Sequence, residues 1–371
     1  MTSVRSYSNL ATNPFLCPRS PILDILLGKV IITLDGGGIR GVLAIVLLRK
    51  IDEELQKWGL SLRDCVDLVG GTSTGGIAGI MYSLLDLPLD KMLEKYFSVA
   101  DFVFGKTKTP FANFFFTGAK HSSDRQRKIY TKVVEEALGD RQTKLRDERL
   151  TKGVDVDEVR RTSLQQFIPM FVVAIDTQDV RHPVIMSSYE QLDDTDKPSS
   201  TSNISIVDAA IATSAAPTFF HSLHHEGKEY IDGGVGFNNP TEIALKQLKV
   251  LYGEDAFPHT LISFGTGRRH KNPFKAACRK RSRFGIRSGV ASVLGMMRTF
   301  ACMTTDSETI HSRVKDYYHE RKLEGYYRFN LDSLADIRLD DNKSVTKAVE
   351  MSKEYLEQPE TQSTVVSKSF T

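Results

Sequence analysis

The chain has 371 residues, of which 40% are hydrophobic and 26% charged, a composition that excludes collagen-like, disordered and disulfide-stapled proteins. The 49 Lys and Arg residues against 46 Asp and Glu leave a net charge of only +3, which argues against nucleic acid as a partner. The four cysteines have no zinc-binding spacing, so we expect free thiols, no metal and no other cofactor.

The chain opens with a polar segment, residues 1–28, in which we find no secretory signal. The longest aliphatic run, residues 42–48, is much shorter than the roughly twenty apolar residues that a membrane span needs. We therefore expect a cytoplasmic protein that does not cross a bilayer.

The next part of the chain repeats a strand, a glycine-rich turn and a helix. Residues 29–34 are β-branched and predict a strand, and after three glycines residues 39–57 predict a helix. Residues 65–69 predict a second strand, 70–76 a second glycine-rich turn and 77–85 an apolar helix. Two such units in succession predict a parallel sheet with helices on its faces.

Two further helices are expected over residues 89–100 and 123–138. Between them, the aromatic residues of 102–116 predict either a loop packed in the core, the simpler interpretation, or one that faces a ligand. Residues 139–166 carry many charges and few apolar side chains, which predicts a solvated insertion. The elements expected after it are strands over 167–175 and 184–188, a small-residue helix over 207–216, a short strand over 229–231, a helix over 241–251 and a strand over 260–264.

The character of the chain changes at residue 268. Nine Lys or Arg residues and no acidic residue stand in 268–287, and 290–303 could form an apolar helix. This region, 268–303, is either a membrane-contacting element or a solvated loop followed by a core helix. A strand over 326–331 and a C-terminal segment, 336–371, with a helix and a polar tail complete the chain, and we expect one elaborated domain over 29–335.

A Gly-x-Ser-x-Gly motif stands between the second predicted strand and its helix, which is the structural context that this motif requires. Gly71 and Gly75 allow a turn too tight for Cβ atoms, and the start of the helix exposes unpaired N–H groups to a developing oxyanion. We therefore interpret Ser73 as a nucleophile, the alternative being a structural serine in a glycine-rich turn.

The first glycine-rich turn also joins a strand to a helix. It consists of Asp35, Gly36, Gly37, Gly38, Ile39, Arg40 and Gly41. Consecutive glycines before a helix let backbone N–H groups converge on an anion, either a nucleotide phosphate or an oxyanion formed at Ser73. The turn lacks the P-loop pattern, so we favour the oxyanion hole. Arg40 either contacts a substrate phosphate or forms a surface salt bridge.

An activated serine needs a base. None of the nine histidines stands in a turn punctuated by glycine, so each is better explained as a surface or structural residue. Asp232 instead ends a short strand and precedes Gly233 and Gly234, and functional sites of α/β sheets gather at the carboxyl ends of strands. We interpret Asp232 as the base, with an Asx-turn residue as the alternative.

Together these motifs resemble those of the patatin-like phospholipases: an Asp-Gly-Gly-Gly-x-Arg-Gly loop, a Gly-x-Ser-x-Gly elbow and an Asp-Gly-Gly turn, in that order. The small residues of 212–218 and the Asn-Asn-Pro of 238–240 add to the likeness, which spans about residues 29–267. The resemblance implies a three-layer α/β/α fold with a mostly parallel central sheet.

The resemblance also implies a serine lipid acyl hydrolase of the phospholipase A type that acts on phospholipids or galactolipids at the membrane surface. Ser73 would attack the ester and Asp232 would take its proton without a histidine and without a metal. The oxyanion hole would be formed by N–H groups of Gly36, Gly37, Gly38 and Thr74. The alternatives are an acyltransferase with the same two residues, or a defence effector gated by a partner or by oligomerisation; the oligomeric state is not predicted.

Overall fold

The computed structural model describes residues 28–105, 123–147, 167–191, 201–217, 219–267 and 307–365. Five segments singled out in the sequence lie wholly or mostly outside these ranges: the N-terminal polar segment, the aromatic loop, the charged insertion, the 268–303 region and the end of the polar tail. No helix of the described ranges is long and apolar enough to cross a membrane.

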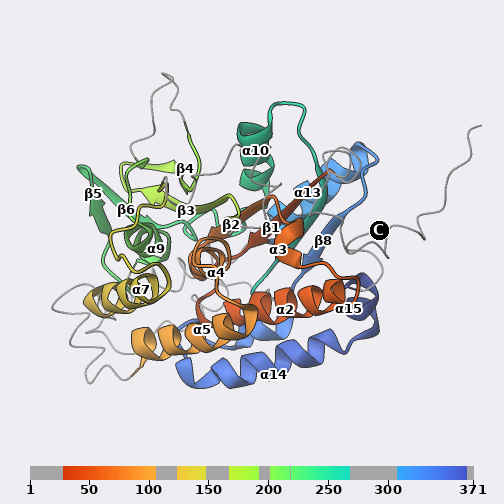
Figure 1. Cartoon of the computed structure of the whole chain (residues 1–371), viewed down its shortest axis with the longest axis horizontal. Coiled ribbons are helices and arrows are strands. Elements are labelled where there is room, and N and C mark those ends of the chain that lie inside the picture. The colour runs from red at the N-terminus through yellow and green to blue at the C-terminus, as the bar shows by residue number, and fades with distance from the viewer. Residues whose placement is uncertain are drawn as a thin grey trace, which may run out of the picture.

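A mixed sheet of eight strands forms the centre of the described part of the chain, in the order β5-β6-β3-β2-β1-β7-β8, with β4 also paired to β3 (Figure 1). The strands are β1 Lys29–Leu34, β2 Leu68–Thr72, β3 Met170–Asp176, β4 Asp179–Ser187, β5 Leu223–His225, β6 Lys228–Asp232, β7 Pro258–Phe264 and β8 Tyr326–Phe329. Neighbours from β3 to β8 in this order run parallel, whereas β4, β5 and β6 add antiparallel pairs at one side.

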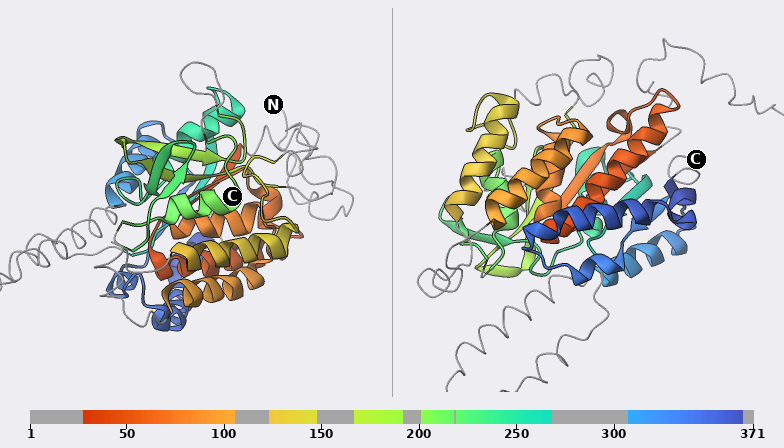
Figure 2. Two further views of the ribbon diagram at one scale, coloured as in Figure 1. Left: turned by 90° about the vertical axis from the view of Figure 1, so that its left-hand side faces the viewer. Right: turned by 90° about the horizontal axis from the view of Figure 1, so that it is seen from below.

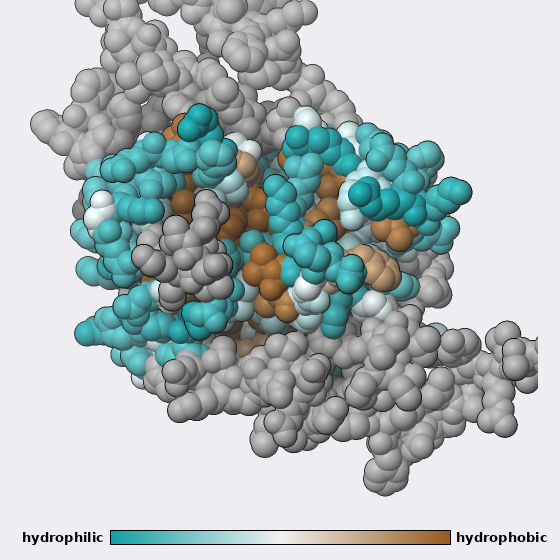
Figure 3. All heavy atoms as spheres, turned by 90° about the horizontal axis from the view of Figure 1, so that it is seen from above, coloured by the Kyte–Doolittle hydropathy of each residue, from teal (hydrophilic) through white to brown (hydrophobic). Residues whose placement is uncertain are grey.

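Helices cover both faces of the sheet (Figures 1 and 2). The larger layer contains α2 Val42–Gln56, α3 Leu62–Cys65, α4 Thr74–Ser83, α5 Leu89–Phe104, α7 Ser123–Leu138, α9 Ile206–Ser214, α14 Val345–Leu356 and α15 Pro359–Ser363. The smaller layer contains α10 Thr241–Tyr252 and α13 Glu308–Glu320. Figure 3 views the molecule from above, over the layer of α10 and α13. Apolar side chains remain visible there between hydrophilic ones, because these two helices cover their face of the sheet less completely.

Alternation along β1 shows why its sequence is almost continuously apolar. Val30, Ile32 and Leu34 pack into the larger helical layer, whereas Ile31 packs with residues of α10 and α13. A strand buried on both faces needs apolar residues at every position. The predicted three-layer α/β/α fold with a mostly parallel central sheet is thereby confirmed.

Two predicted boundaries were wrong around the second strand. Cys65 ends the short helix α3 and the strand begins at Leu68. Gly70 and the residue after it, expected in a turn, lie inside β2, where a Cβ on Gly70 would be 2.3 Å from the Phe171 ring. This glycine therefore reflects close packing between β2 and β3, and the turn shrinks to the single residue Ser73.

The antiparallel side of the sheet was also predicted incompletely. Strand β4 begins at Asp179, earlier than expected, and β5 was not predicted. Val180 is 56% exposed, and β5 and β6 form a short hairpin with charged residues such as Glu229. Strands at a solvated edge lack the continuous apolar run that reveals a buried strand.

Candidate active site

Ser73 is a single strained residue between β2 and α4, with φ 53° and ψ −125°. A residue other than glycine rarely adopts a positive φ, and such backbone strain persists only where the surrounding structure enforces it. Its N–H donates to Thr213 Oγ1 at 2.9 Å, and a Cβ on Gly75 would lie 2.2 Å from the carbonyl oxygen of Leu34. The close packing of β1, α4 and α9 thus holds the serine at the tip of the turn.

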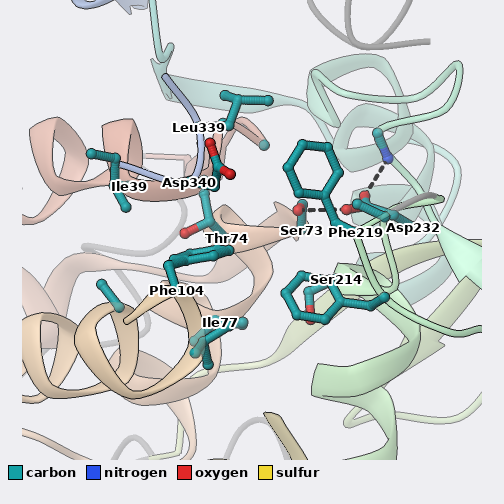
Figure 4. A pocket seen from close by; sticks show the side chains of 18 of the residues that line it. Ile39, Ser73, Thr74, Ile77, Phe104, Ser214, Phe219, Asp232, Leu339 and Asp340 are labelled. Carbon is teal, nitrogen blue, oxygen red and sulfur yellow. Dashed lines mark hydrogen bonds between the residues drawn. The ribbon is translucent and has the colours of Figure 1, made fainter. Parts of the chain in front are cut away.

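The structure brings Ser73 and Asp232 together, although 159 positions separate them in the chain. Ser73 Oγ donates to Asp232 Oδ2 at 2.7 Å, and the N–H of Gly234 donates to Asp232 Oδ1 at 2.7 Å (Figure 4). One carboxylate oxygen therefore receives the serine hydroxyl while the other is fixed by the backbone.

The pairing of β3 with both β2 and β6 brings Ser73 and Asp232 together. Its Val173 pairs with Thr72 at the end of β2, and its next residue, Ala174, pairs with Asp232 at the end of β6. Asp232 is the last residue of its strand, as predicted, but β6 runs antiparallel to β3. Asp232 reaches the site because β3 continues beyond the end of β2 and carries β6 alongside.

Asp232 is only 4% exposed, and this burial shifts its pKa. Desolvation disfavours the charged form and raises the pKa of Asp232 from 3.8 to about 7, although hydrogen bonds from Ser73 and Gly234 act in the opposite direction. A carboxylate with this pKa is a much better proton acceptor than an ordinary aspartate at neutral pH.

The glycine loop after β1 lies directly against the elbow, since a Cβ on Gly36 would be 3.1 Å from Ser73 Cβ. The N–H groups of Gly37, Gly38 and Thr74 donate no hydrogen bond to any group within the described ranges. The N–H of Gly36, in contrast, donates to the carbonyl oxygen of Asn238 at 3.2 Å. Gly36 therefore departs from its expected role as a donor, because its N–H is already engaged in fixing the loop.

Two side chains hold the carbonyl groups of this loop from behind. Arg40 is 1% exposed and its Nε donates to the carbonyl oxygen of Gly37 at 3.2 Å, which rules out the surface salt bridge considered for it. Tyr96 of α5 donates its hydroxyl to the carbonyl oxygen of Gly38 at 2.6 Å, and the same hydroxyl lies 2.6 Å from Thr74 Oγ1. Tyr96 was not singled out in the sequence, where it is one apolar-face residue of a helix.

Asp35, the first residue of the loop, is anchored by β8. Its two carboxylate oxygens accept hydrogen bonds from Arg328 at 3.0 and 2.7 Å, and Arg328 also contacts Glu308 at 3.2 Å. The two partners Asp35 and Arg328 are 293 positions apart, and no motif around Arg328 pointed to it. The start of the loop is thus fixed by the C-terminal part of the chain.

A largely apolar pocket, partly open to solvent, adjoins Ser73 and Asp232 (Figure 4). One wall is apolar and includes Ile77 of α4, Val99, Val103 and Phe104 of α5, and Phe219 and Phe220 before β5. The ring centroids of Phe104 and Phe220 lie 6.0 Å apart. Leu339 and Asp340 also line the pocket, and Figure 4 shows them across it from Ile77.

The described ranges contain no group of three or more His, Cys, Asp or Glu side chains arranged to hold a metal ion. In the same ranges, no histidine hydrogen-bonds to Ser73 or Asp232. The chemistry that this geometry allows is nucleophilic attack by Ser73 on a group held in the pocket, with the proton passing to Asp232 and negative charge developing near free N–H groups.

The chain is similar to known proteins of one family. Residues 32–245 match the family model for patatin-like phospholipase. Patatin-like protein 2 of Arabidopsis thaliana is 30% identical over 307 residues, 72% of this chain and 67% of that protein. Calcium-independent phospholipase A2-gamma of Oryctolagus cuniculus is 25% identical over 85% of this chain and 36% of its own length.

Among solved structures, human GIVD cytosolic phospholipase A2 aligns with a TM-score of 0.35 and 14% identity over 70% of this chain and 46% of its own. The chain spans about two thirds of the plant relative and about a third of the rabbit relative. Because the family model matches more than half of its residues, the chain belongs to the patatin-like phospholipase family.

Proposed function

We propose that the protein is a serine lipid acyl hydrolase of the phospholipase A type that cleaves fatty acyl esters of phospholipids or galactolipids. The observation that carries this proposal is the 2.7 Å hydrogen bond from Ser73 Oγ to Asp232 Oδ2 at a strained elbow beside an apolar pocket. The family supports lipid esters as the substrate class.

In the proposed mechanism, Ser73 Oγ attacks the ester carbonyl carbon while its proton moves to Asp232 Oδ2. The N–H groups of Gly37, Gly38 and Thr74 stabilise the resulting oxyanion. The tetrahedral intermediate then collapses to an acyl-enzyme, and the leaving alcohol takes the proton from Asp232. A water molecule that gives its proton to Asp232 hydrolyses the acyl-enzyme and restores Ser73.

The apolar wall formed by α4, α5 and the phenylalanines suits a fatty acyl chain. Binding there would place the ester at Ser73, with the rest of the lipid toward Leu339 and Asp340 on the opposite side. The raised pKa of Asp232 supports its role as the base, since an ordinary aspartate would hold the serine proton poorly at neutral pH.

The test is fatty acid release from phosphatidylcholine vesicles and from galactolipid micelles in the presence of EDTA. We expect Ser73→Ala and Asp232→Asn each to lower kcat by at least roughly 1,000-fold, as removal of a nucleophile or its partner does in serine hydrolases. Ser98→Ala and Asp336→Asn, two exposed positions, serve as matched controls and should keep full activity. Folded Ser73→Ala or Asp232→Asn protein with undiminished activity would refute the proposal.

A further inference from the structure

The carbonyl group of Gly36, the second residue of the glycine loop, is held by two side chains at once. Thr266 Oγ1 donates to the carbonyl oxygen of Gly36 at 2.7 Å, and Asn238 Nδ2 donates to the same oxygen at 3.2 Å. Thr266 is 5% exposed and Asn238 is 8% exposed, so both hydrogen bonds are shielded from water. The direction of this carbonyl is therefore fixed from outside the loop.

The same two hydrogen bonds fix the direction of the Gly37 N–H group. The carbonyl of Gly36 and the N–H of Gly37 belong to one trans peptide unit, in which the two groups point in opposite directions. Thr266 is not among the described residues that line the pocket, whereas Gly37 is. With the carbonyl turned toward Thr266, the N–H is directed toward the pocket, and it donates no hydrogen bond to any described group.

A peptide unit between two glycines needs such a restraint. Gly36 and Gly37 have no Cβ, so rotation of the peptide plane between them meets little steric resistance. The surroundings leave no room for a side chain that would stiffen the loop. A Cβ on Gly36 would lie 2.4 Å from Asn238 Oδ1, and a Cβ on Gly37 would lie within the contact distance of Thr266, at 2.3 Å from its Oγ1. The restraint therefore comes from the hydrogen bonds that Thr266 and Asn238 donate.

The sheet places Thr266 beside the glycine loop. Strands β1 and β7 run parallel and their last residues pair with each other. Gly36 and Thr266 each stand two residues beyond the end of their strand. The next residue, Gly267, donates its N–H to Asn330 Oδ1 at 2.7 Å. The position of Thr266 thus depends on the pairing of β1 with β7 and on the segment that follows β8.

We propose that Thr266 is a positioning residue for the reaction at Ser73, because its hydroxyl keeps the Gly37 N–H aimed at the oxygen on which negative charge develops. This inference rests on the proposed hydrolase function. An oxyanion donor stabilises the transition state most when it already points to the correct place, since reorienting it during the reaction costs free energy. Asn238 supports the same peptide unit through the longer of the two hydrogen bonds.

The first test is Thr266→Val, which keeps the branched shape of the side chain and removes its hydroxyl. We expect kcat for a soluble p-nitrophenyl ester to fall about 10- to 100-fold, with KM within about twofold of the native value. Thr143→Val is the matched control. Thr143 is also buried, and its hydroxyl donates to the carbonyl oxygen of Asp140 at 2.6 Å, away from the pocket. This control should keep the native kcat and KM.

Two more variants separate the hydrogen bond from the packing of the side chain. Thr266→Ser and Thr266→Cys lack the same methyl group and differ in the donor, which is a hydroxyl in one and a weakly donating thiol in the other. We expect Thr266→Ser to stay within about threefold of the native kcat and Thr266→Cys to approach Thr266→Val. Melting temperatures show whether each variant is folded, and the Ser and Cys pair completes the test if Thr266→Val does not fold.

Inhibitor binding gives a measurement that a purely structural role would not change. With a long-chain trifluoromethyl ketone, Ser73 Oγ bonds to the carbonyl carbon, its proton passes to Asp232, and the carbonyl oxygen becomes an anion. The alcohol of the same chain length enters the pocket without forming this anion. Thr266→Val should raise Ki for the ketone by about the factor by which it lowers kcat, and should leave Ki for the alcohol unchanged.

The outcomes distinguish the role of Thr266 from the hydrolase function. If Thr266→Val and Thr266→Cys keep the native kcat, or if the ketone and the alcohol lose affinity equally, Thr266 contributes packing alone and its positioning role is refuted. Ester hydrolysis by the native chain would then still support the hydrolase function. If the native chain neither cleaves the ester nor binds the ketone more tightly than the alcohol, the hydrolase function itself fails.

Discussion

At the scale of single residues, the buried carboxylate of Asp232 predicts how activity depends on pH. Burial raises its pKa to about 7, and only the ionised form can take the proton of Ser73. We expect kcat/KM for a soluble p-nitrophenyl ester to fall roughly tenfold per pH unit below about pH 7 and to level off above it. A profile that stays flat down to about pH 5 would contradict the role of Asp232 as the base.

The same shift predicts the sign of a stability effect. A raised pKa means that folded Asp232 binds its proton more tightly than the unfolded chain, so its contribution to stability is present below pH 3.8 and is lost as the pH rises to about 7. Asp232→Asn, neutral at every pH, escapes this loss. Thermal unfolding should show it to be more stable than the native chain at pH 8, by about 1–4 kcal/mol, with the gain shrinking toward pH 4. Ser73→Ala removes no charge and should keep the sign of the native pH dependence, with the loss of stability extending to higher pH because the hydrogen bond that lowers the pKa of Asp232 is gone.

Tyr96 is the residue that links the two segments carrying the free N–H groups. Its hydroxyl donates to the carbonyl oxygen of Gly38 and lies 2.6 Å from Thr74 Oγ1. Tyr96→Phe keeps the ring in the core but releases both segments, so we expect kcat to fall about 10- to 100-fold with KM within about twofold of the native value.

Tyr252→Phe is the matched control for Tyr96→Phe. Tyr252 is the last residue of α10 in the smaller helical layer, and its hydroxyl donates to the carbonyl oxygen of Asp67 at 3.1 Å. Its kcat should stay near the native value. If Tyr96→Phe raises KM while kcat is unchanged, Tyr96 shapes the substrate pocket and does not position the oxyanion donors.

At the scale of elements, Arg328 shows how a C-terminal strand supports the glycine loop. Arg328→Met leaves the Asp35 carboxylate, 2% exposed, without its bidentate partner, and such a loss costs about 3–5 kcal/mol. We expect a lower melting temperature and a loss of hydrolysis, with stability partly restored in Asp35→Asn/Arg328→Met.

Lys315→Gln, an exposed cation on α13, is the control for Arg328→Met and should change neither stability nor activity. If Arg328→Met melts like the native protein, the contact with Asp35 does not stabilise the fold.

The helices and strands that could be predicted are those whose residue pattern has a single structural explanation. β1 is buried on both faces and reads as a continuous apolar run, so its bounds, Lys29–Leu34, were predicted correctly. Gly70 has another cause, contact with Phe171, and a glycine in a strand looks the same in the sequence as a glycine in a turn. For this reason the second strand was placed too early.

The candidate site divides in a similar way. Ser73 and Asp232 stand in short glycine-rich motifs that can be recognised in the sequence. The structure places Ser73 Oγ 2.7 Å from Asp232 Oδ2. Tyr96 and Arg328 belong to ordinary helical and strand sequences. Their importance comes from contacts across the fold, such as the one between Arg328 and Asp35 over 293 positions, which no local pattern encodes.

At the scale of the whole molecule, the C-terminal region and the family region form one core. The family model ends at residue 245, yet Arg328 holds the glycine loop and Leu339 lines the pocket. The C-terminal helix α14, predicted within a separate end segment, shares its hydrophobic core with α2 through Val345 and Ala348. Residues beyond the family motifs therefore shape both the support and the entrance of the site.

This construction from one chain predicts how activity responds to dilution. Ser73, Asp232 and the N–H groups of Gly37, Gly38 and Thr74, which donate no hydrogen bond to the described residues, all come from the same copy, so the proposed chemistry needs no second copy to complete the site. We expect hydrolysis per molecule of a soluble ester to stay constant over a roughly hundredfold dilution that crosses any change of size seen by size-exclusion chromatography. Activity that disappears on dilution together with a larger species would instead favour an effector gated by oligomerisation, in which a neighbouring copy opens or orders the pocket.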